Sequence, residues 1–337
     1  MDYDLLVIGE DRGGIERAIA AAQQGDRVAI VGTGQSAPSL DSMRLAIINL
    51  AEQREVTMAA WRAEVSRLNR CQLQSDNAEL DCFGVERITG QAKFVSPRTV
   101  TISHSHEQRI VSSTEIVLAC GSRSQRPPYL RCDDHFVLTI ESLLGLVDVP
   151  RSTIIVGAGE TGLSAAIMLA DLGVDVTVVD EHVTLLELCG MFDPTFDAIQ
   201  SLDIAFRLDD AVIGTELRPD LQAGVRLASG RVIVADSVLI CVAQEGRTDG
   251  LNLETAGVGV DERGRVWCDD SGRTWAPTIA AVGRVAGLSR TERHSRSDIE
   301  LSAIAFDYPV ATNVRGEPGV HHFPSVRPLI SAGAAIR

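Results

Sequence analysis

The sequence predicts an α/β fold with two parallel-sheet domains, because a strand–turn–helix–strand pattern occurs twice along the chain. In each copy an apolar strand leads into a glycine-bearing turn, and a helix then leads to a second apolar strand. The first copy places its strand, helix and strand at residues 3–8, 14–24 and 27–31. The second copy places them at residues 153–156, 162–172 and 175–179. The interval from Gly9 to Gly32 has the same length as that from Gly157 to Asp180, so both copies share one register.

The segments outside the two copies also have helix and strand patterns. A helical stretch is expected after the first copy, at residues 39–69. Short β segments are expected to follow it at residues 84–88, 93–95, 99–102 and 115–119. A β meander is expected at residues 204–241 and a last buried strand at 278–283. The tail from Arg284 is polar, rich in arginine and then marked by proline and glycine, so we expect it to be poorly ordered.

Composition and charge limit the class of protein. With 337 residues the chain is long enough for about two domains, and it is 45% hydrophobic and 23% charged, as ordinary soluble globular proteins are. A formal net charge of -15 repels nucleic acid and anionic membranes, so we expect neither as a partner. The sequence has no signal-peptide pattern and no membrane-length apolar stretch, and its cysteines form no close pair. These features predict a cytoplasmic protein with reduced thiols and without a disulfide framework or a zinc site.

The turn of the second copy, residues 157–162, reads Gly-Ala-Gly-Glu-Thr-Gly and has the G-x-G-x-x-G spacing of a dinucleotide-binding loop. The first glycine allows the tight turn, the second lets backbone amides approach a pyrophosphate, and the third lets helix and strand pack closely. Asp180, at the end of the next strand, can accept hydrogen bonds from ribose hydroxyls. With Glu181 beside it a 2′-phosphate is repelled, so NAD is favoured over NADP. The alternative is an empty unit that merely retains its glycines.

Several motifs resemble those of the pyridine nucleotide–disulfide oxidoreductases, in particular the branch of the soluble pyridine nucleotide transhydrogenases and dihydrolipoamide dehydrogenases. The motifs are the repeat itself, Ala119-Cys120-Gly121-Ser122-Arg123, and the runs 246–258 and 274–283. The resemblance implies two Rossmann-like dinucleotide-binding domains, with an NAD-binding domain at 149–273 inserted into an FAD-type domain at 1–148 and 274–337. Because the chain ends soon after residue 283, the resemblance also implies that the family's C-terminal dimerisation domain is absent. The residues expected to bind NAD are Gly157, Gly159, Glu160, Thr161, Gly162, Asp180, Glu181 and Gly246.

The resemblance places FAD on the first copy, but the residues expected to hold it have changed. The turn at residues 9–14 reads Gly-Glu-Asp-Arg-Gly-Gly, so Asp11 replaces the middle glycine. A carboxylate about 4 Å from a phosphate oxygen costs on the order of 4 kcal/mol at an effective dielectric constant of about 20, which is about three decades of affinity. Gly32 stands where an acid would hold the ribose, and Gly283-Arg284 stands where Gly-Asp would hold the ribityl chain. The degraded flavin site therefore comprises Gly9, Asp11, Gly14, Gly32, Gly283 and Arg284.

The redox groups of the family are missing as well. The resemblance places a C-x4-C disulfide near residues 34–41, where the sequence has no cysteine, although the transhydrogenase branch dispenses with that pair. Met43 stands where the resemblance implies a lysine near the flavin ring. The absent dimerisation domain would also remove the His–Glu pair that the family uses across its dimer interface.

Three further side chains leave alternatives open. His182 is interpreted as an exposed loop histidine, and a contact with the adenine end of NAD is the alternative. Cys120 is interpreted as a buried structural thiol, although its turn passes close to FAD in the family. Arg247 fits a structural role and a ligand-lining role equally well.

The sequence favours an NAD(H)-binding, non-catalytic protein without bound flavin, which acts as a sensor or as the partner of an unidentified protein. Asp11 and Arg284 carry opposite charges at positions that face one pocket in the family, so we expect them to approach each other, with Arg12 as the rival partner of Asp11. The competing hypothesis is an FAD-dependent NAD(P)H oxidoreductase or transhydrogenase in which Arg12 or Arg284 rebuilds the phosphate contacts. A decayed chain with neither ligand is the third possibility.

Overall fold

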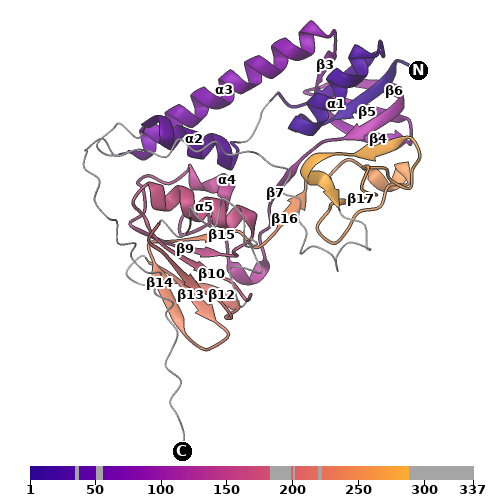
Figure 1. The fold of residues 1–337 in the computed structure, drawn as a ribbon. Coiled ribbons are helices and arrows are strands. Elements are labelled where there is room, and N and C mark those ends of the chain that lie inside the picture. Colours follow the sequence, from indigo (N-terminus) through magenta and orange to yellow (C-terminus); the bar gives the residue numbers. More distant parts are fainter. Residues whose placement is uncertain (35–37, 51–55, 183–198, 200–201, 219–221, 288–337) are drawn as a thin grey trace, which may run out of the picture. The chain divides into compact units, whose positions relative to one another are not determined.

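The computed structural model describes residues 1–34, 38–50, 56–182, 199, 202–218 and 222–287. Within these residues the chain divides into two units (Figure 1). The first unit contains Met1–Ala46, Ala59–Gln125 and the described chain from Ala243 onwards, and the second unit is built mainly from Arg126–Val242. The chain therefore leaves the first unit, forms the second and returns, which is the topology of one domain inserted into another.

Seven of the described strands form the main sheet of the first unit, namely β1 (Tyr3–Ile8), β2 (Val28–Gly32), β3 (Glu86–Thr89), β4 (Gln91–Ser96), β5 (Thr99–His104), β6 (Glu107–Leu118) and β18 (Ile279–Ala281). Their order is β3-β2-β1-β6-β5-β4, and β18 pairs with β6 as well. The strands β3, β2, β1 and β18 run parallel to the second half of β6. The first half of β6 forms an antiparallel ladder with β5.

Parallel pairing brings three loops to one edge of this sheet. Strands β1, β6 and β18 end at Ile8, Leu118 and Ala281, and all three end on the same side because they are parallel. The turn after β1, the residue Cys120 and the residue Gly283 therefore meet beyond that edge. The carboxyl edge of a parallel sheet is where ligands bind in folds of this type.

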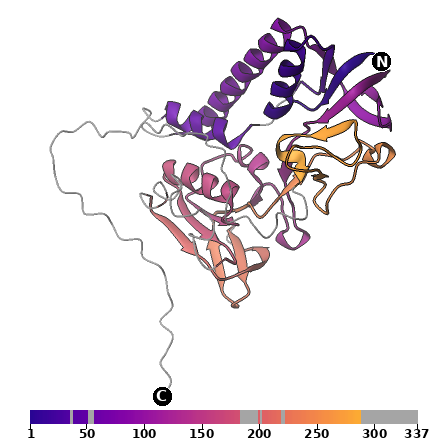
Figure 2. The ribbon, with the colours of Figure 1, turned by 45° about the vertical axis from the view of Figure 1, so that its right-hand side comes forward.

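Helices and two apolar layers cover the sheet of the first unit. The helical cover comes from α1 (Arg12–Gln23) and from Leu80 near the end of α3 (Met58–Cys82), while α2 (Leu40–Leu50) precedes α3 in the chain. Helix α1 packs on β1 and β2 (Figures 1 and 2) and buries Ile15, Ala18 and Ile19 against one face of the sheet. The other face, which includes Leu6 and Phe94, forms a separate core with the last part of the unit.

The returning segment completes the first unit. Strand β16 (Gln244–Gly246) pairs with β7 (Ser122–Ser124), which is the last strand before the chain leaves. Further on, β17 (Val266–Trp267) pairs with β19 (Ala286–Gly287). These short pairs hold Gly283 and its neighbours in place beside the first glycine turn.

The second unit contains a parallel sheet with the strand order β11-β10-β9-β15-β8. Its strands are β8 (Val137–Leu138), β9 (Ser152–Val156), β10 (Asp175–Val179), β11 (Ile204–Arg207) and β15 (Ser237–Ile240). Helix α5 (Glu160–Asp171) joins β9 to β10 and packs on both, and the short helix α4 (Ile140–Leu143) follows β8. An antiparallel sheet of β12 (Val212–Leu217), β13 (Ala223–Leu227) and β14 (Val232–Ala235) shares one apolar core with the parallel sheet.

The structure corrects two boundaries that the sequence suggested. The chain passes between the units after Gln125 and Val242, not at 148/149 and 273/274, because β8 already pairs with β15 in the second unit. The segment around Leu251 instead packs in the core of the first unit.

The helical stretch expected at 39–69 is two helices, α2 and α3. Helix α3 continues to Cys82 because no glycine or proline occurs before Gly84, whose φ is +70°. The expectation about the tail falls on residues 288–337, which lie outside the described residues.

Candidate functional site

The glycine loop of the second unit leaves the N-terminus of α5 uncovered. Gly159 is the N-cap residue, and a Cβ built on it would meet no atom within 4 Å. A Cβ on Gly162 would instead collide with the carbonyl oxygen of Gly157, so the third glycine is required for packing. Glu160 and Thr161 begin the helix, and the Glu160 side chain is exposed. The loop thus presents backbone amides and the positive end of the helix dipole, which suits a phosphate group.

Asp180 follows the end of β10 and is tied to this loop. Its Oδ2 accepts a hydrogen bond from the backbone N–H of Ala158 at 2.6 Å, and its Oδ1 accepts one from the backbone N–H of His182 at 2.9 Å. The ring Nδ1 of His182 contacts the same Oδ1. Burial raises the pKa of Asp180, but the hydrogen bonds from Ala158 and His182 outweigh burial and lower the pKa below its ordinary value. The carboxylate therefore remains ionised and can accept a hydrogen bond from a ribose hydroxyl.

The corresponding loop of the first unit contains a carboxylate at the helix N-terminus. Asp11 is the N-cap residue of α1, and its Oδ1 accepts a hydrogen bond from the backbone N–H of Arg12 at 3.0 Å. Its Oδ2 accepts one from the backbone N–H of Arg284 at 3.4 Å, and a Cβ on Gly283 would collide with the same oxygen. An intramolecular anion thus occupies the N-terminus of α1, whereas the N-terminus of α5 has no side-chain cap.

A second carboxylate enters the first site from a residue that the sequence analysis missed. A Cβ on Gly32 would collide with the carboxyl group of Glu10, and the Oε2 of Glu10 accepts a hydrogen bond from the backbone N–H of Gly34 at 3.0 Å. The acid expected at the end of β2 has therefore been replaced by one that reaches the same place from the turn. The signal in the sequence was the pairing of an acid at position 10 with a glycine at position 32.

The expected charge pair of Asp11 and Arg284 is not found, because Asp11 is contacted by the backbone amide of Arg284 and not by its guanidinium. Among residues 1–34 and 222–287 no ion pair joins the guanidinium of Arg284 to Asp11. The rival partner also binds Asp11 through its backbone, since the guanidinium of Arg12 contacts Glu16 at 2.9 Å and Asp76 at 3.1 Å. The local cause is that Asp11 caps the helix, which turns its oxygens towards amides.

Other expected residues have packing roles in the first unit. A Cβ on Gly9 or on Gly14 would collide with Ala119, so the two outer glycines of the loop keep their function. Gly246, expected to bind NAD, lies in β16 of the first unit, where a side chain would collide with the carbonyl oxygen of Gly264. This close approach accounts for a glycine at position 246 without a cofactor contact.

Cys120, beside the first site, and Met43 both have structural environments. Burial, and to a smaller extent the charge of Asp11, raises the pKa of the Cys120 thiol to about 11, as expected of a structural thiol. Met43, which replaces the expected lysine, is buried, and its carbonyl oxygen accepts a hydrogen bond from the indole N–H of Trp61 at 2.8 Å. Arg247 is exposed, which leaves both of its interpretations open.

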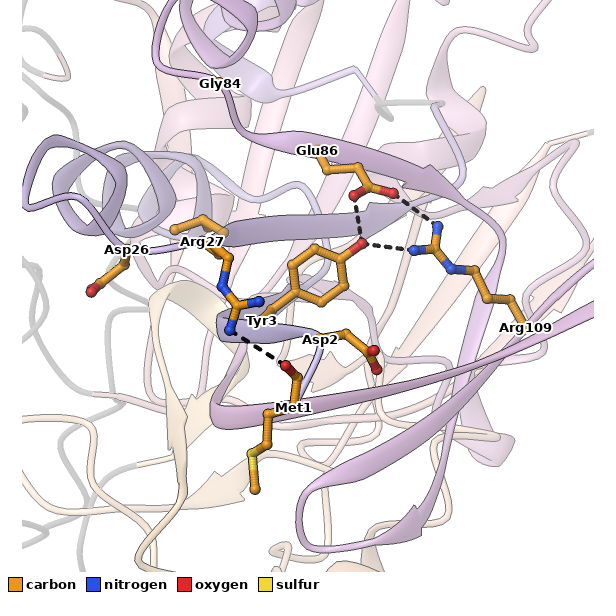
Figure 3. A pocket seen from close by; sticks show the side chains of 9 residues that line it. Met1, Asp2, Tyr3, Asp26, Arg27, Gly84, Glu86 and Arg109 are labelled. Carbon is orange, nitrogen blue, oxygen red and sulfur yellow. Dashed lines mark hydrogen bonds and ion pairs between the residues drawn. The ribbon is translucent and has the colours of Figure 1, made fainter.

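A cavity of about 560 Å³ lies at the opposite edge of the first sheet (Figure 3). Glu86 and Arg109 both contact the Tyr3 hydroxyl, at 2.5 Å and 2.8 Å, and also bind each other at 2.8 Å. Arg27 contacts Asp4 and the carbonyl oxygen of Met1. Because these polar groups satisfy one another, the arrangement joins β1, β3 and β6 and carries no argument for a ligand.

No helix among the described residues is long and apolar enough to cross a membrane. Within the same residues no group of three or more His, Cys, Asp or Glu side chains could hold a metal ion.

The model of the pyridine nucleotide-disulphide oxidoreductase family matches residues 3–307. The chain belongs to this family. The family is FAD-dependent and uses a pyridine nucleotide as substrate.

Individual members of the pyridine nucleotide-disulphide oxidoreductases support this assignment. The chain is 31% identical over 357 residues to a soluble pyridine nucleotide transhydrogenase of Mycobacterium bovis (strain BCG / Pasteur 1173P2), an alignment that covers 96% of this chain and 75% of that protein. It is 28% identical over 313 residues to a dihydrolipoamide dehydrogenase of Chaetomium thermophilum, and this alignment covers 84% of this chain and 62% of that protein. The fold resembles that of the HOCl-induced flavoprotein disulfide reductase RclA from Escherichia coli, with a TM-score of 0.71 and 22% identity. This match covers 86% of this chain and 68% of that one. The fold also resembles that of LpdA from Mycobacterium tuberculosis, with a TM-score of 0.72 and 21% identity, and this match covers 84% of this chain and 68% of that one.

Two features of the first site bear on whether it could hold the FAD of this family. A flavin pyrophosphate needs the amides of α1 and the space before them, and the carboxylate of Asp11 already accepts from the first of those amides. The residue after Gly283 is an arginine, so the site also lacks the acid expected for the ribityl chain. The ribose contact alone has a substitute, in Glu10.

Proposed function

We propose that this chain is an NAD(H)-binding protein that holds the cofactor on its second glycine loop and carries no flavin. In this proposal it senses NAD(H) or serves another protein, and it does not catalyse the redox reaction of its family. The observation that carries the proposal is the difference at the middle position of the two loops. Gly159 leaves open space before a helix N-terminus, whereas Asp11 fills the matching space with a negative charge.

The geometry of the second unit supports NAD(H) in particular. The pyrophosphate would lie against the amides at the start of α5, and the adenosine ribose would lie against Asp180. Asp180 is ionised and is held by Ala158, so a hydroxyl group finds an acceptor there. Asp180 and Glu181 together repel a 2′-phosphate, which favours NAD(H) over NADP(H).

Charge and space both act against flavin in the first unit. A carboxylate about 4 Å from a phosphate oxygen costs on the order of 4 kcal/mol at an effective dielectric constant of about 20. Converted to affinity, this cost is about three decades. A flavin would also have to displace the hydrogen bonds from the backbone amides of Arg12 and Arg284 to Asp11. The site therefore favours its own side chain over the cofactor.

A second candidate function is an FAD-dependent NAD(P)H oxidoreductase or a soluble transhydrogenase. It is favoured by Glu10, because the carboxylate of Glu10 lies where the ribose acid of an FAD site is expected. In this case Arg284 would have to supply the charge for the pyrophosphate, since the guanidinium of Arg12 is held by Glu16 and Asp76. The two functions differ in whether flavin binds.

Isothermal titration of the purified chain with NADH, NADPH and FAD separates the candidates. The proposal predicts saturable NADH binding at one site, NADPH binding weaker by about tenfold or more, and no binding of FAD. Equimolar FAD binding would establish the second candidate, and failure of all three ligands to bind would remove both.

A further inference from the structure

A short ribbon of two strands in the first unit lies where the chain leaves that unit and returns to it. Strands β7 and β16 pair antiparallel over three residues each, and their register places Arg123 opposite Glu245 (Figure 1). The backbone N–H of Gln125 extends the pairing, because it donates to the carbonyl oxygen of Ala243 at 3.0 Å. A two-stranded ribbon of this length has little stability of its own, so its opening is sensitive to whatever holds its ends.

One end of the ribbon is connected through the chain to the second glycine loop. Cys241, which follows β15, is buried. A Cβ on Gly157 would meet the carbonyl oxygen of Cys241 at 2.7 Å, and a Cβ on Gly162 would meet its Cβ at 3.4 Å. The glycine loop thus packs on Cys241, and only two residues separate Cys241 from the start of β16.

We propose that the ribbon of β7 and β16 opens less readily when NADH occupies the second glycine loop, and that this ribbon is the element through which the chain signals the presence of its cofactor. The inference rests on the proposed NAD(H)-binding function and extends it from binding to signalling.

The physical step from ligand to ribbon is the loss of motion at Cys241. A pyrophosphate bound to the amides at the start of α5 restricts the glycine loop, and the loop in turn restricts the residue on which it packs. The chain just before β16 is then fixed, and a ribbon with one end fixed spends less time open. A ligand that favours the closed ribbon shifts the equilibrium towards it.

Ion pairs of Arg123 set how readily the ribbon opens. Its guanidinium contacts Glu245 across the ribbon at 3.3 Å and Asp249 beyond the end of β16 at 2.5 Å. The side chain of Arg123 is 45% exposed and that of Asp249 is 69% exposed, so both pairs lie at the surface and their contribution is small. The closed ribbon is therefore favoured by little enough for a bound ligand to change its population.

The other end of the ribbon is linked to the first glycine turn. The backbone N–H of Arg247 donates to the carbonyl oxygen of Gly121 at 3.1 Å, and a Cβ on Gly121 would lie 3.9 Å from the Oδ2 of Asp11. Arg247 is exposed. A closed ribbon thus holds an exposed cation beside the turn that contains Asp11, so the signal reaches the surface of the first unit.

Amide hydrogen exchange of the full chain, with and without saturating NADH, tests the proposal. We expect peptides that cover residues 121–125 and 243–247 to exchange more slowly with NADH, by about fivefold or more. A peptide that covers β5 of the same unit is the internal reference and should exchange at one rate in both states. Equal exchange of the ribbon with and without NADH, in a chain that titration shows to bind NADH, would overturn this inference and leave the proposed function intact. A chain that binds no NADH would remove the proposed function as well.

Two variants test the part played by Arg123. Arg123→Gln removes both ion pairs, so the ribbon of the free chain should exchange faster by about threefold or more, and NADH should still slow it. Arg87→Gln breaks the ion pair of Arg87 with Asp81 at 3.0 Å, which lies in the same unit but outside the ribbon, and should leave the exchange of the ribbon unchanged. Equal exchange of the ribbon in the two variants would show that Arg123 does not hold it closed.

Discussion

The carboxyl group of Glu10 lies where any side chain on Gly32 would have to lie. The two residues are far apart in the sequence, yet they have exchanged the positions of an acid and a glycine at one point of the first dinucleotide-type site. In the proposed assignment of this site, the exchange keeps a negative charge at the ribose end, and Asp11 adds another at the pyrophosphate end. The first site is therefore filled from within by two side chains of its own turn.

The exchange predicts a measurable coupling between positions 10 and 32. Gly32→Glu alone should lower the free energy of unfolding by about 1–3 kcal/mol, because the new side chain is forced against Glu10. Glu10→Ala combined with Gly32→Glu should recover most of that loss, since the collision is removed. Urea unfolding of the wild type, both single variants and the double variant measures the coupling energy. Additive effects of the two substitutions would show that the side chains do not compete for one space.

Flavin affinity should return when the pyrophosphate end is reopened. The double variant Asp11→Gly/Arg284→Asp removes the carboxylate from the N-terminus of α1 and supplies the acid expected after Gly283. Because Glu10 already provides an acid at the ribose end, FAD affinity should rise by up to about three decades. The matched variant Asp11→Asn removes the charge but not the bulk, so a smaller gain is expected. FAD fluorescence quenching gives both values, and a double variant no better than the wild type would contradict this account.

A carboxylate at the matching position of the second loop should strongly weaken NADH binding. Gly159→Asp places a carboxylate before the N-terminus of α5, where a Cβ meets no protein atom, so the fold should be retained. NADH affinity should fall by about three decades, by the charge argument applied to Asp11. Val147→Asp, at a side chain of the same unit that is 82% exposed, adds the same charge away from the loop and serves as the control. Equal NADH affinities for the two variants would show that the loop does not hold the pyrophosphate.

Tyr3 should ionise later than an ordinary tyrosine. Burial first, and then the hydrogen bond and charge of Glu86, raise the pKa of Tyr3 above its ordinary value of 10.0, although Arg109 acts in the opposite direction. A raised pKa in the folded state means that Tyr3 stabilises the fold below pH 10 and that this contribution is lost as the pH rises towards the folded-state pKa.

The chain contains 3 tyrosines, so the late-ionising one can be resolved by near-ultraviolet absorbance during an alkaline titration. Tyr3→Phe should remove the late phase and leave the remaining tyrosines unchanged. A titration curve in which Tyr3→Phe loses an ordinary early phase would show that the Tyr3–Glu86–Arg109 network does not form as described.

The sequence was sufficient to predict both strand–turn–helix–strand units, although the first helix was expected from Gly14 and begins at Arg12, with Asp11 as its N-cap. These features depend on local periodicity and spacing, which are visible in a single chain. The boundary at Gln125 was missed because β8 is only two residues long, and its membership of the second sheet depends on pairing with β15. A strand of that length has no periodicity of its own.

The role of Glu10 could not be predicted position by position. A motif assigns each role to one sequence position, so the glycine at position 32 was interpreted as the loss of the ribose acid. Glu10, in the turn, was given no role. The structure relates the two because a long side chain from one strand end can reach the end of the neighbouring strand. For the same reason the expected side-chain pair of Asp11 and Arg284 is found instead as a contact with a backbone amide.

The visible absorbance spectrum of the full chain, purified without added cofactor and followed by denaturation to release any bound flavin, tests the central claim most directly. Closure of the first site by Asp11 predicts a colourless protein that releases no flavin but still binds NADH. A yellow protein that releases one flavin per chain would contradict it, because a pyrophosphate would then lie where the Asp11 carboxylate has been placed.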